Sequence, residues 1–99
     1  MKLVKSSLQM TLTKETKDGA FLTWVPSIPG STFSSCSLHY GPLTEAVHVT
    51  TKIDPDRGHV TLANLTPYTP YYAYLTCYQG ADMYPTNTVH FTPRQYLLL

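Results

Sequence analysis

Charge is scarce in this sequence, and long apolar runs are absent. Asp, Glu, Lys and Arg make up 13% of the 99 residues, and the formal net charge is +1. Domains that bind nucleic acid usually carry a strongly basic surface, so we expect no nucleic-acid partner. No stretch reaches the apolar length that spans a bilayer, so we expect no direct membrane insertion by the domain. Low charge together with 12% aromatic residues argues against disorder.

The two ends of the sequence also lack targeting features. Residues 1–7 contain no apolar central segment of the kind that a secretory signal needs. An extracellular location would therefore require that such a signal had been removed or replaced. The tail 94–99 ends in an apolar run that is too short to span a membrane, and we leave open a linker, the start of a membrane span or an artificial addition.

Residue patterns for catalysis, metal binding and phosphate binding are missing. The six acidic residues are spread over expected turns and form no spaced pair for acid–base chemistry. The histidines and cysteines show neither His-x-x-x-His nor Cys-x-x-Cys spacing, and no glycine-rich phosphate loop occurs. We therefore expect no catalytic residue, no metal site and no cofactor, and we predict that the protein is not an enzyme.

Short alternating runs separated by turn residues fill the chain instead. Eight prolines and eight tyrosines suit short strands joined by turns, and no helical periodicity of useful length occurs. Turn signals recur every 8–12 residues, which predicts an all-β, seven-stranded antiparallel sandwich of immunoglobulin-like type. The expected strands are 8–13, 20–26, 33–40, 45–51, 59–65, 71–78 and 86–93. Gly41-Pro42 is expected to end the third strand, and Gln79–Pro85 to form a loop.

The alternation also predicts which side chains face the core. Successive residues of a strand point to opposite faces, so the apolar set of each run should lie inside. The predicted core consists of Leu22, Trp24, Leu38, Tyr40, Val60, Leu62, Leu75, Val89 and Phe91.

The stretch Leu65–Cys77, with the sequence LTPYTPYYAYLTC, combines a proline turn with the start of a long strand. Pro67 fixes φ and has no amide hydrogen, so a strand ladder cannot continue through it. Tyr71 can bury its ring and return its hydroxyl to the backbone a few residues upstream. We therefore predict a tyrosine corner formed by Leu65, Pro67, Thr69 and Tyr71.

In these residues the chain resembles the fibronectin type III family. The marks that carry the resemblance are Trp24, Leu62 and the spaced set Leu65, Pro67, Thr69 and Tyr71. The resemblance implies three strands packed on four, with a domain over 8–93, a flank over 1–7 and a tail over 94–99. It also implies a non-catalytic extracellular protein-interaction module of a cell-surface receptor or adhesion protein.

The only two cysteines, Cys36 and Cys77, are both expected to point inward. In the family the third and sixth strands are antiparallel neighbours, and the resemblance then brings these two residues to the same end of the pair. Directly opposed residues lie close enough for a disulfide, so we predict one, with two buried thiols as the alternative. The cysteine positions and the corner together resemble the first such module of the Axl/Mer/Tyro receptor tyrosine kinases.

Asn64-Leu65-Thr66 fits the acceptor sequence for N-linked glycosylation. It precedes the corner at the rim of the domain, where the Asn64 side chain should point outward. Glycosylation together with a disulfide would suit the secretory pathway and an extracellular location. The alternative is an ordinary solvated turn residue.

Tyrosines occupy the outward positions of the sixth expected strand. Because tyrosine is enriched at protein interfaces, we predict a partner-binding surface on this face. The alternative is that aromatic residues simply suit strands and cover their neighbours. The face should contain Tyr72, Tyr74, Thr76 and Tyr78, with His39 and His90 from the neighbouring strands.

A second candidate surface is a loop tip that presents Met83 and Tyr84 beside the loop 27–32. The expected partner is another protein or a neighbouring module of the same chain, and the domain is expected to be monomeric in isolation. Two further alternatives remain open at this point. The chain could be a structural spacer that binds nothing itself, or an engineered scaffold of the same fold.

Overall fold

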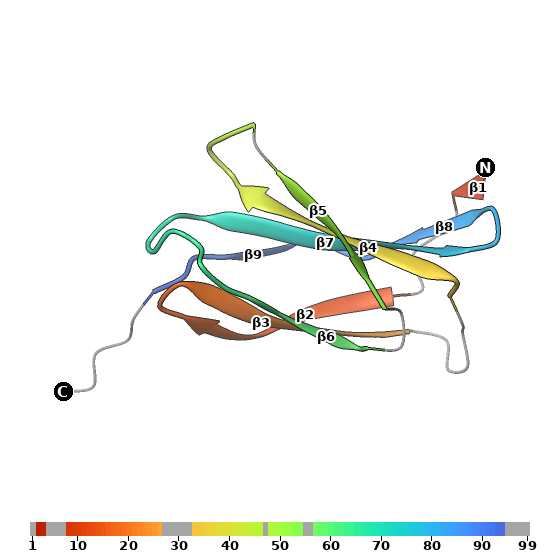
Figure 1. Ribbon diagram of the computed structural model, residues 1–99, viewed down its shortest axis with the longest axis horizontal. Coiled ribbons are helices and arrows are strands. Elements are labelled where there is room, and N and C mark those ends of the chain that lie inside the picture. Colours follow the sequence, from red (N-terminus) through yellow and green to blue (C-terminus); the bar gives the residue numbers. More distant parts are fainter. Residues whose placement is uncertain (1, 4–7, 27–32, 47, 55–56, 95–99) are drawn as a thin grey trace.

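The computed structural model describes residues 2–3, 8–26, 33–46, 48–54 and 57–94, which form two facing β-sheets (Figure 1). The expected loop 27–32, the tail beyond Arg94 and most of the N-terminal flank lie outside the described residues. The smaller sheet has the order β2 (Leu8–Thr16), β3 (Gly19–Pro26), β6 (His59–Leu62). The larger sheet has the order β1 (Lys2–Leu3), β8 (Asp82–Pro85), β7 (Tyr71–Gln79), β4 (Ser35–Pro42), β5 (Val49–Ile53), and β9 (Val89–Phe91) also pairs with β7. The predicted all-β sandwich is confirmed.

The long strand β7 organises the larger sheet, because β4 pairs along one side of it and both β8 and β9 pair along the other. The prediction of a loop over Gln79–Pro85 is wrong. The chain reverses at Gly80 and Ala81 alone, and Gly80 takes the positive φ of 63° that a tight turn needs. Because the turn is so short, the residues after it return along β7 as a strand.

Thr86 marks the break between β8 and β9. Its backbone N–H donates to the carbonyl of Leu75 at 2.9 Å, and its Oγ1 accepts from the backbone N–H of Leu75, also at 2.9 Å. A side-chain hydroxyl therefore takes the place of the carbonyl that a regular ladder would supply. The last strand, expected over 86–93, is therefore shortened to β9, and β8 precedes it in the segment expected to be a loop.

Side-chain hydrogen bonds close one edge of the sandwich, between β2 and the final segment. Asn87 Oδ1 accepts from the backbone N–H of Met10 at 2.8 Å, and Asn87 Nδ2 donates to the carbonyl of Met10 at 3.0 Å. Farther along, Glu15 Oε2 accepts from the backbone N–H of Thr92 at 2.7 Å. These bonds join β2 to the residues that flank β9 of the other sheet, and they satisfy the backbone groups of Met10 and the backbone N–H of Thr92.

The third and fourth expected strands have different limits in the structure. β4 continues through Gly41 and Pro42, which pair with β7 only. On the other side of β4, β5 extends only as far as Val49, which pairs with Tyr40. Pro42 has no backbone N–H to donate, and no described strand lies beside it on that side to accept one. Glu45 and Ala46, expected in a strand, lie exposed in the connection from β4 to β5.

The β2–β3 hairpin turns at Lys17 and Asp18, with Thr16 opposite Gly19. Gly19 is required here because a Cβ at this position would overlap the backbone carbonyl of Leu62. The backbone N–H of Leu65 donates to the carbonyl of Asp18 at 2.8 Å. The hairpin turn is therefore held directly against the start of the expected corner.

The core fills the space between the two sheets. Seven of the nine predicted core residues are buried, and the exceptions are Tyr40 and Val89. These two are only half-buried and pack against the core from its margin, because Tyr40 is opposed by the exposed edge residue Val49 and Val89 lies on the short strand β9. Ala20, Cys36, Cys77 and Tyr71 are buried as well, as their inward positions lead one to expect, and the structure adds Leu8, Met10, Ile53 and Ala73 to the buried apolar set.

Candidate binding surface

The corner residues are held by hydrogen bonds between nearby backbone and side-chain atoms. Tyr71 is 6% exposed, and its hydroxyl accepts from the backbone N–H of Thr66 at 2.9 Å. Thr69 Oγ1 donates to the carbonyl of Pro67 at 3.4 Å. The ring of Tyr71 stacks on Phe91 with the centroids 5.8 Å apart. The corner thus fixes where β7 begins, and with it the direction of every later side chain on that strand.

Cys36 and Cys77 form a disulfide between β4 and β7, so the prediction of a disulfide is confirmed and the two-thiol alternative is wrong. The residues are directly opposed, with Cα atoms 4.0 Å apart. Both side chains are buried. The bond joins the two central strands of one sheet and fixes their register.

The outward face of the larger sheet carries three neighbouring rings, two from β7 and one from β4. The register places His39 opposite Tyr74, and directly opposed residues share a face of the sheet. The ring centroids of His39 and Tyr74 are 4.7 Å apart, and those of Tyr74 and Tyr72 are 6.3 Å apart. All three side chains are half-buried. We call His39, Tyr74 and Tyr72 the aromatic row; His90 lies opposite Tyr72 and is exposed.

The surroundings of His39 favour the neutral form of its imidazole. Partial burial, and then repulsion from His48, hold the pKa of its imidazole below the ordinary value of 6.5. Its Nδ1 lies 3.2 Å from Oγ1 of Thr50 on β5, which fixes the ring against Tyr74. The aromatic row is therefore neutral, and its centre is formed by Tyr74.

The remaining predicted surface residues divide between the two faces of the sheet. Tyr78 lies opposite Met83 on the outward face, at the other end of β7 from Tyr72. Thr76, expected to be exposed between them, is 7% exposed because β4 and β8 flank it on either side. The outward face is therefore divided into the aromatic row and a smaller pair, Tyr78 with Met83.

Met83 and Tyr84 were predicted at a loop tip, and this placement is wrong for both, because they lie on β8. Tyr84 lies opposite Cys77, on the core side of the sheet. Its ring packs edge-to-face on Phe33 at 5.3 Å, and its hydroxyl donates to Oε1 of Gln79 at 3.3 Å. The tight turn at Gly80 is the reason, since it extends the strand through the segment expected to be a loop.

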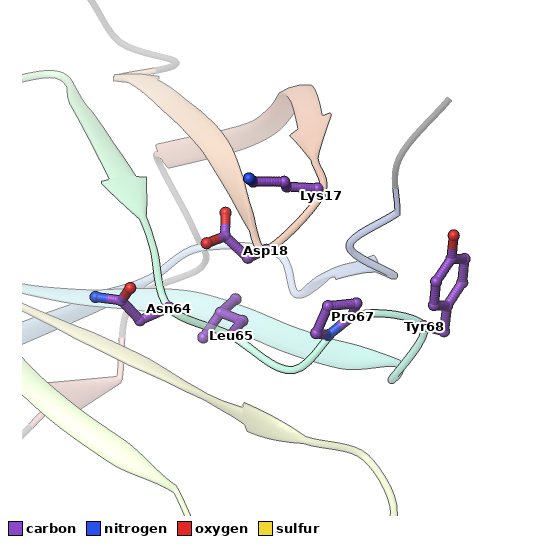
Figure 2. Close-up of a pocket in the computed structure, with 6 residues that line it drawn as sticks. All are labelled: Lys17, Asp18, Asn64, Leu65, Pro67 and Tyr68. Atoms are coloured by element: carbon purple, nitrogen blue, oxygen red, sulfur yellow. The ribbon is translucent and has the colours of Figure 1, made fainter. Parts of the chain in front are cut away.

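A pocket of about 510 Å³ lies beside the corner (Figure 2). It is lined by Lys17, Asp18, Asn64, Leu65, Pro67 and Tyr68. Asn64 is exposed, as expected, and has a φ of 61°. Tyr68 is 71% exposed with a φ of 60°, and the sequence reasoning missed it. Its place between two proline turns was the available signal, but the backbone angle cannot be read from residue types.

No group of three or more His, Cys, Asp or Glu side chains that could hold a metal ion occurs in the part of the chain that the structure describes. In the same part, no helix is long and apolar enough to cross a membrane.

Comparison with protein families finds one match that spans most of the chain. The family model of the fibronectin type III domain matches residues 6–92. The match includes the corner, both cysteines and the aromatic row. No curated protein matches the chain.

Solved structures show the same fold at low sequence identity. A two-domain fibronectin type III segment of chicken tenascin has a TM-score of 0.76 and 21% identity, covering 91% of this chain and 50% of that one. The corresponding domain of the human collagen alpha-1(XX) chain has a TM-score of 0.75 and 15% identity, covering 99% and 89%. A computationally redesigned β-sandwich protein has a TM-score of 0.75 and 23% identity, covering 88% and 92%.

Proposed function

The chain belongs to the fibronectin type III family, and on this premise we propose that it is an extracellular protein-interaction module of a cell-surface receptor or adhesion protein. Domains of this family are non-catalytic modules that occur in multi-domain chains and often mediate protein interactions. We further propose that the aromatic row is the surface that contacts the partner.

The stacking within the row carries this proposal. Tyr74 stacks on His39 with the centroids 4.7 Å apart, which covers one face of its ring, and Tyr72 lies nearly parallel to it with the centroids 6.3 Å apart. A partner would therefore meet mainly the ring edges and the hydroxyl groups of the row. Nucleobases stack on open ring faces, whereas protein interfaces use the apolar edge and polar tip of tyrosine together. The arrangement therefore favours a protein partner.

The electrostatics of the row agree with this. Charged residues are depleted at the centres of protein interfaces, because their desolvation is costly. The lowered pKa of His39 keeps the ring neutral at pH 7. A partner would thus bury no charge at the centre of the row, and the exposed His90 would lie near its margin.

The disulfide supports the extracellular part of the proposal. Disulfides persist mainly in oxidising compartments, and this one is buried between the central strands of the sheet. The acceptor sequence at Asn64 is also exposed, as glycosylation in the secretory pathway requires.

A structural spacer is the second candidate, and the shape of the domain favours it. The principal dimensions are 48 × 29 × 20 Å, and β1 and the end of β9 lie toward opposite ends of the long axis (Figure 1). Such a domain sets a distance between the modules on either side. The binder and the spacer differ in whether the aromatic row contributes to any interaction.

Binding to an array of purified extracellular proteins separates these two functions. The parent domain, displayed as a tetramer to raise avidity, should bind a protein on the array, and Tyr72→Ala with Tyr74→Ala should abolish the signal. Val25→Ala is the matched control, because Val25 is 61% exposed on the other sheet. Absence of binding by the parent would favour the spacer, and equal binding by all variants would exclude the aromatic row.

A further inference from the structure

The pocket beside the corner has a polar wall and an apolar floor. Figure 2 shows Asn64 and Tyr68 at opposite ends, with Leu65 and Pro67 between them. Lys17 and Asp18, from the turn of the β2–β3 hairpin, form the facing wall. At about 510 Å³, the pocket is within the size range of small-ligand sites, roughly 300–1,000 Å³.

Tyr68 is held in a conformation that its side chain disfavours. Its φ of 60° lies in the left-handed region, which Gly or Asn adopts at lower cost than an aromatic residue. Its backbone N–H donates to the carbonyl of Pro93 at 2.7 Å, which holds the residue there. The side chain is 71% exposed, and no described aromatic ring stacks on it. Backbone strain of this kind is concentrated at sites that contact ligands.

Asn64, at the other end of the pocket, is available for modification. It begins the triplet Asn64-Leu65-Thr66, it is exposed, and its amide has no hydrogen-bond partner among the described residues. Its φ of 61° is one that Asn tolerates well. The acceptor amide and the exposed ring of Tyr68 thus border the same pocket.

We propose that Asn64 carries an N-linked glycan whose first sugars lie in this pocket and pack against Tyr68; this rests on the extracellular location proposed above. The donor is a lipid-linked pyrophosphate oligosaccharide. A bond forms between Asn64 Nδ2 and the anomeric carbon of the sugar. The bond from that carbon to the pyrophosphate oxygen breaks, the pyrophosphate leaves with the electron pair, and Nδ2 loses one proton.

The chemistry of the pocket matches that of a sugar. A pyranose ring has apolar C–H faces, which suit the side chains of Leu65, Pro67 and Tyr68, and a rim of hydroxyl groups. The charged groups of Lys17 and Asp18 can form hydrogen bonds with that rim. The Asn64 amide points away from Pro67 in Figure 2, so the linkage must rotate to enter the pocket, which exposed side chains do within nanoseconds.

The test uses the 99-residue chain, secreted from eukaryotic cells behind an added signal sequence that is removed on secretion. Intact mass should show an added glycan that an amidase specific for Asn-linked sugars removes and that Thr66→Ala lacks. Thr66→Ala removes the acceptor sequence but leaves Asn64 and the backbone N–H of Thr66 in place. The glycosylated parent should melt about 4 °C above Thr66→Ala, the scale expected for one aromatic contact in a domain of this size.

Tyr68→Gly separates packing in the pocket from glycosylation itself. In this background the added mass should remain, and the increase in melting temperature due to the glycan should vanish. Tyr72→Ala is the matched control, because its ring lies in the aromatic row and the increase should persist. If the added mass is absent, Asn64 is not a glycan site. If the glycan raises the melting temperature of Tyr68→Gly as much as that of the parent, the sugars do not pack against Tyr68. Neither result affects the array experiment, which tests the aromatic row.

Discussion

The hydroxyl of Tyr71 accepts a hydrogen bond from the backbone N–H of Thr66 at 2.9 Å, across the turn that connects the two sheets. This bond satisfies a partly buried amide and fixes the first residue of β7. Since β7 carries one cysteine of the disulfide and two rings of the aromatic row, the corner sets the position of both.

Tyr71→Phe should therefore destabilise the domain by about 1–3 kcal/mol, because the amide of Thr66 loses its acceptor while the ring still packs on Phe91. Tyr40→Phe is the matched control, since Tyr40 is half-buried and its hydroxyl has no partner among the described residues. Urea unfolding measures the difference. Equal losses in the two variants would contradict a specific role for the hydrogen bond.

Removal of the disulfide should cost about 4 kcal/mol in the chain-entropy model, because it closes a loop with a sequence separation of 41. The variant Cys36→Ala with Cys77→Ala measures this loss together with any cavity that it creates. Unfolding of the parent with and without a reductant measures the stability due to the disulfide alone, because both cysteine side chains stay in place and no cavity forms. An unfolding midpoint that does not respond to reductant would show that the bond is not formed in solution.

Gly19→Ala should be among the most damaging small substitutions, at about 3 kcal/mol, because the new methyl group would overlap the backbone carbonyl of Leu62. Gly80→Ala is a useful comparison. It has open space around it but a φ of 63°, so only the backbone conformation should be strained, at about 1 kcal/mol. Thermal melting should rank Gly19→Ala well below Gly80→Ala, and the reverse order would contradict the close approach of the hairpin to β6.

The sequence predicts well those features that depend on residues close together in the chain or on simple alternation. Pro67 and Tyr71 are four residues apart, and their types alone indicate the corner. Leu22, Trp24 and Leu38 are found in the core because alternation within a strand needs no knowledge of its neighbours.

Features that depend on backbone angles or distant contacts could not be predicted. The turn at Gly80 and Ala81 fixes whether Tyr84 lies on a strand or in a loop, and both outcomes are compatible with the same residues. The bond between Asn87 and Met10 spans 77 positions in the sequence. The positive φ of Tyr68 is imposed by its neighbours against its own preference.

The stability of the domain should fall on mild acidification, partly through His39. The pKa of this residue is lowered in the folded state by partial burial and by His48, so the unfolded chain binds the proton more readily. This contribution is present above the unfolded-state pKa and is lost as pH falls through 6.5 and below. The groups that act on the ring are Tyr74 from β7, Thr50 from β5, and His48, which precedes β5 in the chain.

Urea unfolding at pH 7.5 and 5.5 measures this effect. The loss of stability between the two values should be smaller in His39→Gln than in the parent. His48→Gln should also reduce it, because it removes the repelling charge. An equal loss in the parent and in both variants would exclude His39 as the source.

The central claim is that the aromatic row binds a protein partner, and the affinity of Tyr74→Ala for a partner found on the array tests it most directly. Tyr74 is the middle ring of the row, so its removal should weaken binding at least about tenfold, the scale of an interface hot spot. Val25→Ala should bind as the parent does, since Val25 lies on the opposite sheet. An affinity for Tyr74→Ala equal to that of the parent would contradict the claim.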